Sequence, residues 1–218
     1  MSLSNSEENY LKAIFKLSIK GEKNASTNDI AESVQTKAAS VTDMLKKLAE
    51  KELIIYEKYK GVSLTAKGDE IARKLVRNHR LWEVFLVEKL GFKWDEVHPI
   101  AEQMEHVYSV ELIQRLDAFL GFPKYDPHGD PIPNEKGIIE IQKSKALSEL
   151  KLKDSGIIVG VKDSSASFLK YLDSLQLNLG VKLLVKDRIE FDSSMIIETA
   201  DKRILAVSQQ IAKNILVK

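Results

Sequence analysis

Prolines gather at one place in this chain. Four of the five, Pro123, Pro127, Pro131 and Pro133, lie within eleven residues. Because proline lacks a backbone N–H and fixes φ, neither a helix nor a central strand continues through such a stretch. Before the proline-rich stretch, apolar residues repeat with helical spacing. After it, strands are predicted at 156–161, 181–189 and 194–207, with a helix at 167–175. The sequence therefore predicts a mainly α protein with small β content, in which a proline-rich linker over 123–147 precedes a small β-barrel over 148–218.

The first 65 residues combine three helical stretches with a β-rich pair. Helical spacing runs over residues 10–19, 26–34 and 38–51, with a turn at 36–37 between the second and third. Residues 53–65 form two β-rich runs around a Lys-Tyr-Lys-Gly tip, which is typical of a hairpin. This order predicts a winged helix-turn-helix domain over residues 1–65. The alternative is a small helical domain with an ordinary solvated face.

The third predicted helix presents a surface suited to DNA. Val41, Met44, Leu45 and Leu48 form its inward face, which leaves small and polar side chains outside. Such a face enters a major groove without steric conflict, and lysines at the hairpin tip reach phosphates. The candidate DNA-binding residues are Thr27, Thr36, Lys37, Ala39, Ser40, Thr42, Asp43, Lys46, Lys58, Tyr59 and Lys60.

The stretch VHPIAEQMEHV, residues 97–107, concentrates side chains that bind metals. Residues 97–107 are predicted to be helical, with Pro99 in the first turn of that stretch, where the missing N–H leaves no helical bond unmade. The outer bounds of the metal-ligand helix are predicted at about residues 94 and 107. One face of that helix would carry His98, Glu102, Glu105 and His106. The preceding predicted helix, residues 66–90, carries His79 and Glu83 four residues apart. These side chains indicate a site for a divalent metal. The alternative is a solvated charged face with scattered histidines.

Residues 66–122 are predicted to form a helical metal-binding and dimerisation domain. The 66–90 helix also carries Arg73, Lys74, Arg77 and Arg80, which either contact DNA phosphates or keep the helix soluble. The sequence does not distinguish these two roles. An apolar helix over residues 110–120 offers a surface for a homodimer.

Composition narrows the class of protein. The chain has no cysteine, which excludes a disulfide framework, a thiolate zinc site and a cysteine nucleophile, and which fits a cytoplasmic protein. Its apolar runs are too short for a bilayer, and its polar start is not a signal peptide, so no membrane partner is expected. The net charge is +1, but residues 1–80 are basic and residues 81–140 are acidic. This distribution favours an anionic partner for residues 1–80 and a cation for residues 81–140.

The chain resembles the DtxR/MntR metal-dependent transcriptional repressors. The resemblance covers essentially the whole chain, and its most specific part is Glu102-x-x-Glu105-His106 combined with His79-x-x-x-Glu83 after a winged helix. The matching stretches are ENYLKAIFKL, DIAESVQTKAASVTDMLKKLAEKELIIYEKYKGVSLTAKG, NHRLWEVFL, HPIAEQMEHVYS and PHGDPIP. The resemblance implies an SH3-like C-terminal module. It also implies a dimer that senses Mn²⁺ or Fe²⁺ and binds palindromic double-stranded DNA operators.

The resemblance also implies which residues hold metal. The primary, activating site corresponds to Glu102, Glu105 and His106, and Asn9 stands where the N-terminal helix contributes methionine or aspartate. The ancillary site corresponds to His79, Glu83 and His98, with Asp126, His128 and Asp163 as further candidates from the linker and the C-terminal module. Lys12 stands where some two-domain manganese sensors have a glutamate that completes a two-metal cluster.

The resulting prediction is a non-enzymatic regulator, a repressor of metal-uptake genes. Metal would connect the N-terminal helix to the helix carrying Glu102, Glu105 and His106 and so stabilise the DNA-competent dimer. One alternative is a winged-helix regulator that answers a different ligand. Another is a metal-dependent hydrolase, which would need a substrate cleft and a general base.

Overall fold

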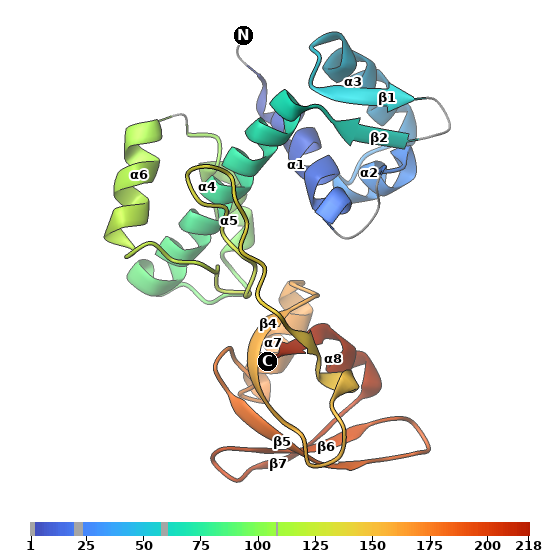
Figure 1. The fold of residues 1–218 in the computed structure, drawn as a ribbon, viewed down its shortest axis with the longest axis vertical. Helices are drawn as coiled ribbons and strands as arrows, with labels where there is room; N and C mark the ends of the chain where they lie inside the picture. The colour runs from blue at the N-terminus through green and yellow to red at the C-terminus, as the bar shows by residue number, and fades with distance from the viewer. Residues whose placement is uncertain (1–2, 20–23, 58–60, 108) are drawn as a thin grey trace. The chain divides into compact units, whose positions relative to one another are not determined.

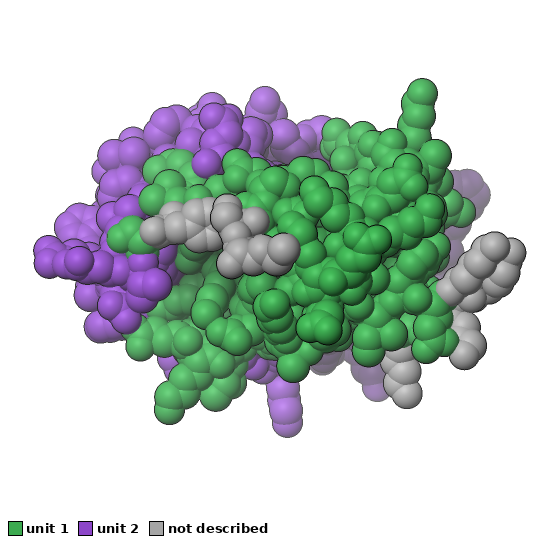
Figure 2. All heavy atoms as spheres, turned by 90° about the horizontal axis from the view of Figure 1, so that it is seen from above, with its two compact units in different colours: residues 1–79, 104–109, 133–138 green, residues 80–103, 110–132, 139–218 purple. Residues whose placement is uncertain are grey.

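The computed structural model describes residues 3–19, 24–57, 61–107 and 109–218. They form two compact units (Figure 2): the first contains residues 1–79, 104–109 and 133–138, and the second contains residues 80–103, 110–132 and 139–218. Helix α4, Ala66–Leu90, begins in the first unit and ends in the second. A search of the described residues finds no helix that is both long and apolar enough to cross a membrane.

The first unit contains the predicted helix-turn-helix and hairpin (Figure 1). Its elements are α1 (Asn5–Ile19), α2 (Thr27–Ser33), α3 (Ala38–Glu50), β1 (Ile54–Glu57) and β2 (Gly61–Leu64). The strands pair antiparallel, with Ile54 opposite Leu64 and Tyr56 opposite Val62. The predicted tip residues Lys58, Tyr59 and Lys60 lie outside the described residues.

Local sequence explains how these elements meet. At the start of α2 the Ser26 side chain accepts from the Asp29 backbone N–H, and the Asp29 carboxylate accepts from the Ser26 backbone N–H. Gly68 lets α4 start against the hairpin, because a Cβ there would lie 2.0 Å from the carbonyl oxygen of Leu53. The core between the helices is fully buried and consists of Leu11, Ile14, Phe15, Ile30, Val41, Leu45 and Leu48.

The predicted helix over residues 94–107 is shorter than expected. Helix α5 spans His98–Met104, with Pro99 in its first turn as predicted, and residues 94–96 form a turn. The backbone N–H of Val107 bonds to the carbonyl of Met104 in a tightened final turn, and the carbonyl of Glu105 accepts from the side chain of Asn78. Glu105 and His106 therefore follow the helix, and the predicted end of the helix at residue 107 is three residues too late.

The second unit contains the end of α4, most of α5 and α6 (Val110–Phe119), which agrees with the predicted 110–120 helix. The rings of Phe85 on α4 and Phe119 on α6 lie 6.3 Å apart between centroids. Several apolar side chains around α6 are exposed, among them Val110, Leu112, Phe119 and Phe122.

The C-terminal part is a six-stranded antiparallel sheet with strand order β3-β8-β4-β5-β6-β7. Its elements are β3 (Lys145–Ala146), η1 (Leu147–Glu149), β4 (Ser155–Val161), α7 (Ala166–Ser174), β5 (Lys182–Arg188), β6 (Met195–Thr199), β7 (Ile204–Val207), α8 (Gln209–Asn214) and β8 (Ile215–Val217). The predicted 194–207 strand is two paired strands, because Lys202 turns the chain at φ 67°. The apolar core includes Leu147, Ile158, Leu172, Val185 and Ile215, and Trp94 joins it.

Candidate metal centres and DNA-binding face

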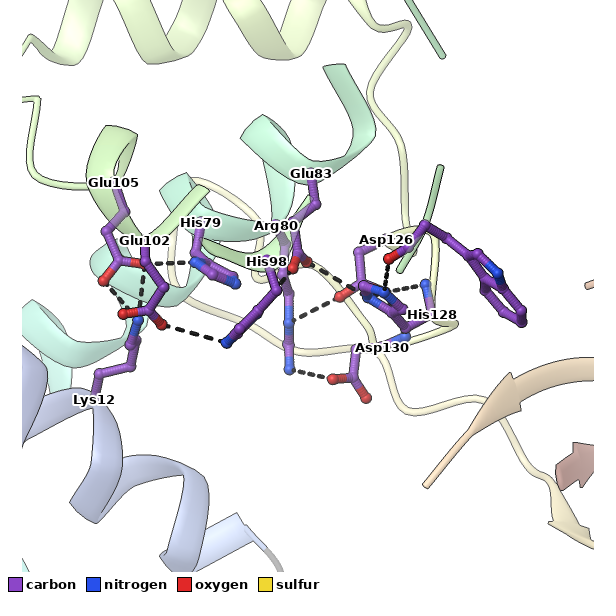
Figure 3. Close-up of polar contacts among 11 residues, drawn as sticks. Lys12, His79, Arg80, Glu83, His98, Glu102, Glu105, Asp126, His128 and Asp130 are labelled. Atoms are coloured by element: carbon purple, nitrogen blue, oxygen red, sulfur yellow. Dashed lines mark hydrogen bonds and ion pairs between the residues drawn. The ribbon is translucent and has the colours of Figure 1, made fainter. Parts of the chain in front are cut away.

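The first cluster lies in the first unit and joins α1, α4 and the segment after α5 (Figure 3). Lys12 Nζ donates to both carboxylate oxygens of Glu105, at 2.6 Å to Oε1 and 2.8 Å to Oε2. His79 Nδ1 lies 2.5 Å from Glu105 Oε2. The exposed fractions of Glu105 and Lys12 are 1% and 5%. This buried carboxylate therefore has an ammonium and an imidazole as its partners.

Sequence reasoning missed Glu8 on α1. Its Oε2 lies 2.6 Å from Nδ1 of His106, and both side chains are buried. Burial raises the pKa of Glu8, and the contact with His106 opposes that shift. The sequence did hold a signal: Glu8, Leu11, Lys12 and Phe15 fall at helical spacing on one face, so two charged residues share a buried face with two apolar ones.

Asn9 supplies the test of whether these residues fit a metal. Its side-chain oxygen Oδ1 is buried and has no hydrogen-bond partner among the described residues. A buried amide oxygen in that state costs free energy, and a metal ion is one kind of partner that satisfies it. If Asn9 joined Glu8, Glu105 and His106 around one ion, the donor set would consist of oxygens and imidazole. That set fits Mn²⁺ or Fe²⁺.

In the second unit, α4 and α5 bring a further set of predicted ligands together. His98 Nδ1 lies 3.2 Å from Glu83 Oε1, and His98 Nε2 lies 3.5 Å from Glu102 Oε1 (Figure 3). Glu83 is buried, while the side chains of His98 and Glu102 are partly exposed. The predicted pairing of Glu83 with His98 is thus present, and Glu102 extends it by one turn of α5.

Glu83 also belongs to a buried three-residue cluster with Asp126 and His128, and ligand atoms of all three lie within 4.8 Å of one another. His128 Nδ1 is 3.7 Å from Glu83 Oε2 and 4.0 Å from Asp126 Oδ1. Its Nε2 donates to the carbonyl of Trp94 at 2.8 Å. A ring nitrogen that donates to a carbonyl fixes the tautomer and leaves the other nitrogen for a metal. The cluster therefore has the donors and the orientation of a metal site.

The charges of this cluster depend on one another. Burial lowers the pKa of His128, but Glu83, Asp126 and the Trp94 carbonyl together raise it to about 9. Burial raises the pKa of Asp126 to about 7, helped by Glu83 and Asp130 and opposed by Arg80 and His128. Without a metal, the imidazolium of His128 compensates the carboxylates around it.

The loop that carries Asp126 and His128 is fixed to strand β4. Asp126 Oδ1 accepts from the backbone N–H of His128 at 2.8 Å and of Asp130 at 3.0 Å. The carbonyl of His128 accepts from Val161 N at 3.0 Å. Gly129 has φ +88°, and a Cβ there would lie 2.2 Å from the carbonyl oxygen of Val159. Only glycine fits this approach, so the ligand loop and β4 are one rigid contact.

The arginines of α4 hold the proline-rich segment. In the first unit, Arg73 donates to the carbonyl of Gly137 at 3.0 Å and Arg77 donates to that of Pro133 at 2.7 Å. In the second unit, Arg80 lies 3.4 Å from Asp126 and 3.2 Å from Asp130. These contacts give the arginines a role that the sequence did not indicate, and they test neither of the two roles that it left open. Lys74 instead pairs with Glu70 on the exposed side of the helix.

Asp163, the candidate from the C-terminal module, lies in the turn before α7. Its Oδ1 accepts from the backbone N–H of Ser165 at 2.8 Å. It joins none of the three-ligand groups found among the described residues.

The candidate DNA-binding residues lie on and around α3. The side chains of Thr36, Lys37, Ala39, Ser40, Asp43 and Lys46 are exposed. Thr27 and Thr42 are half-buried, and Thr42 Oγ1 donates to the Ala38 carbonyl at 3.1 Å. Lys46 is 3.3 Å from Asp43 in an exposed pair, which leaves both side chains open to a partner.

Family models cover most of the chain. Residues 2–62 match the iron dependent repressor N-terminal DNA binding domain. Residues 65–134 match the iron dependent repressor metal binding and dimerisation domain, and residues 145–218 match the FeoA domain.

Individual proteins extend this similarity. The HTH-type transcriptional regulator MntR of Bacillus subtilis is 39% identical over 111 residues, which are 51% of this chain and 77% of that protein. A solved structure of a manganese-dependent transcriptional repressor complex with manganese is 35% identical, with a TM-score of 0.86 over 97% of this chain and 98% of the other. A probable metal transport system membrane protein of Chlamydia trachomatis is 55% identical over 71 residues. Those residues are 33% of this chain, which spans only 16% of that protein's length.

Proposed function

The chain belongs to the DtxR/MntR family of metal-dependent transcriptional repressors, and we propose that Mn²⁺ or Fe²⁺ activates it to bind an operator as a homodimer. The observation that carries the proposal is the first cluster. Glu8 and Asn9 come from α1 of the DNA-binding part, whereas Glu105 and His106 come from the segment after α5. Residues that hold one ion from both segments would restrain the DNA-binding part.

The proposal assigns two sites. The activating site takes Glu102, Glu105 and His106 with Asn9, and Glu8 is added to it because it contacts His106. The ancillary site takes the predicted residues His79, Glu83, His98, Asp126 and His128. The contacts of Glu83 with His98 and with the Asp126–His128 loop, all within the second unit, support it. Asp163 remains a candidate through the resemblance alone. When bound, the ion supplies positive charge that these carboxylates share.

The proposal also assigns DNA, metal and the second protomer to parts of the chain. Residues 1–65 bind DNA through the exposed face of α3 and the hairpin, and residues 66–122 bind metal and form the homodimer through the exposed apolar surface around α6. The 123–147 segment links them to the module at 148–218. A two-fold dimer implies a palindromic operator. The similarity to a manganese-dependent transcriptional repressor and to the iron dependent repressor domains supports control by one of these metals. A cytoplasmic location and metal-uptake genes as targets are part of the proposal.

The test uses metal and DNA directly. A pool of random-sequence duplexes is selected on full-length protein loaded with Mn²⁺, and the winning duplex is titrated with and without a chelator. We expect a palindromic sequence whose binding is lost on chelation. His106→Ala should lose the metal response while keeping the fold, whereas the exposed Lys74→Met variant should retain the response. Glu105→Ala should also lose the response, and its unfolding temperature should fall because the buried Lys12 loses its carboxylate partner. If the wild type binds DNA equally well with and without the chelator, the result would instead support a regulator that answers another ligand.

A further inference from the structure

The Lys12 ammonium binds the Glu105 carboxylate, which the proposed activating site needs as a metal ligand. Its ammonium donates to both oxygens of Glu105, at 2.6 and 2.8 Å, and His79 is placed at Oε2 as well. A long lysine chain ordinarily extends its charged end to water. Here the ammonium is buried beside a buried carboxylate, in a position that a cation bound by Glu105 would share.

An ammonium and a metal ion exclude each other at such a carboxylate. An ammonium has three donors and no lone pair, so the Lys12 ammonium offers nothing that a metal could bind. Its positive charge also repels a divalent cation a few ångströms away, most strongly in a buried site. Filling the site through Glu105 therefore requires that the Lys12–Glu105 pair be weakened or broken.

We propose that the Lys12 ammonium competes with the metal ion for the Glu105 carboxylate and so sets the free concentration of Mn²⁺ or Fe²⁺ at which the activating site fills. This inference rests on the proposed function. The same contact stabilises the metal-free protein, because it compensates the Glu105 carboxylate. Removing the ammonium thus has two opposite effects. The metal-free protein becomes less stable. The metal-bound protein becomes more stable relative to the metal-free protein, so the affinity for metal rises. A merely structural lysine would produce the first effect without the second.

The experiment measures Mn²⁺ binding by the full chain after removal of metal with a chelator. Free Mn²⁺ is read from its electron paramagnetic resonance signal, so DNA is not involved. The binding step of interest is the one that Glu105→Gln abolishes. Lys12→Met keeps the length and apolar stem of the side chain but removes its charge. Lys12→Arg keeps the charge, and Lys74→Met removes a charge from an exposed pair as the matched control.

We expect Lys12→Met to bind Mn²⁺ at least about tenfold more tightly, which is modest for repulsion between buried cations at an effective dielectric constant of about 20. Its metal-free form should unfold at a lower temperature. Lys12→Arg and Lys74→Met should stay near the wild type. Unchanged or weaker binding by Lys12→Met overturns the inference. If Lys12→Met does not fold without metal, Lys12→Gln carries the same comparison. A wild type that binds no Mn²⁺ while Lys12→Met does supports the inference. If neither binds, both the inference and the proposed site fail.

Discussion

At the scale of single residues, His128 makes metal binding dependent on pH. An imidazole must be neutral before it can ligate, and the surroundings of His128 raise its pKa to about 9 although burial alone would lower it. Below that pH the ring must release a proton when metal enters. The apparent affinity of the Glu83–Asp126–His128 cluster for Mn²⁺ should therefore rise with pH by about tenfold per unit between pH 7 and pH 9, where His128 alone releases a proton, and level off above pH 9. Below pH 7 the rise should be steeper, because the Asp126 carboxyl, with its pKa of about 7, must release a proton as well.

Calorimetric Mn²⁺ titrations in buffers of different ionisation enthalpy measure this proton release. His128→Gln should remove the release along with the ancillary binding step. His98 is also assigned to the ancillary site, so His98→Gln should weaken that binding step, but each ion that still binds should displace the proton of His128. Proton release that is equal in wild type and His128→Gln would show that His128 is not a ligand.

The ligand-type residues were largely predictable from the sequence, but their partners were not. Four-residue spacing identified Glu83 and His98 separately, each as part of a histidine–glutamate pair, and the family resemblance placed them in one site. The structure shows that their side chains lie together. Nothing in the spacing of His79 indicated that its ring contacts Glu105, because that contact joins segments 26 residues apart. Glu8 was not predicted because it is one of two acidic residues in the first turn of α1, where acidic side chains ordinarily respond to the helix dipole.

At the scale of elements, Glu7 connects α1 to α3, the helix with the candidate DNA-binding face. Its Oε1 accepts from Lys51 at 2.6 Å and lies 3.2 Å from Lys47, while Oε2 accepts from the Ser4 backbone N–H. Burial raises the pKa of Glu7, but these contacts outweigh burial and lower it to about 2. Because the folded-state pKa is depressed, Glu7 stabilises the fold above the unfolded-state value of 4.5, and that stability is lost as pH falls from 4.5 toward 2.

Replacing Glu7 with Gln should therefore lower the free energy of unfolding near neutral pH and flatten its decline between pH 4.5 and about 2. Urea unfolding followed by circular dichroism across this range checks the slope. Glu70→Gln is the matched control, since Glu70 pairs with Lys74 at the surface, where such pairs contribute little. A decline as steep in Glu7→Gln as in the wild type would remove the carboxylate from the link between α1 and α3.

Helices and strands were predictable from the sequence where the apolar residues keep a regular spacing over many residues. Helices α1 to α4 and α6 lie where apolar spacing predicts them, because each buries one stripe against a core. The early end of α5 did not follow, since Glu105 and His106 have ordinary helical spacing. Trp94 shows why the region before α5 is a turn: its ring is buried in the core of the C-terminal sheet, a contact that no local pattern encodes. Helix α8 and strand β8 were missed because three to six residues are too few for a period.

At the scale of the whole molecule, the proposed ancillary site has consequences for the C-terminal sheet. The loop with Asp126 and His128 contacts β4 through Val161 and Gly129, while Glu83 belongs to α4. An ion held by Glu83, Asp126 and His128 would therefore connect α4 to β4 within the second unit. We expect two Mn²⁺ per chain in the wild type and one in His128→Ala.

Hydrogen exchange reports the same connection through backbone amides. With Mn²⁺ bound, the amides of Val161 and of the 126–130 loop should exchange more slowly than without it, because local opening must then break metal ligands as well as hydrogen bonds. His128→Ala should lose this metal-dependent protection. Asp163→Asn should keep both the protection and the second ion, since Asp163 lies outside the cluster. If Asp163→Asn instead loses the second ion, the C-terminal module supplies a ligand directly, and the loop contact with β4 is not what couples the site to the sheet.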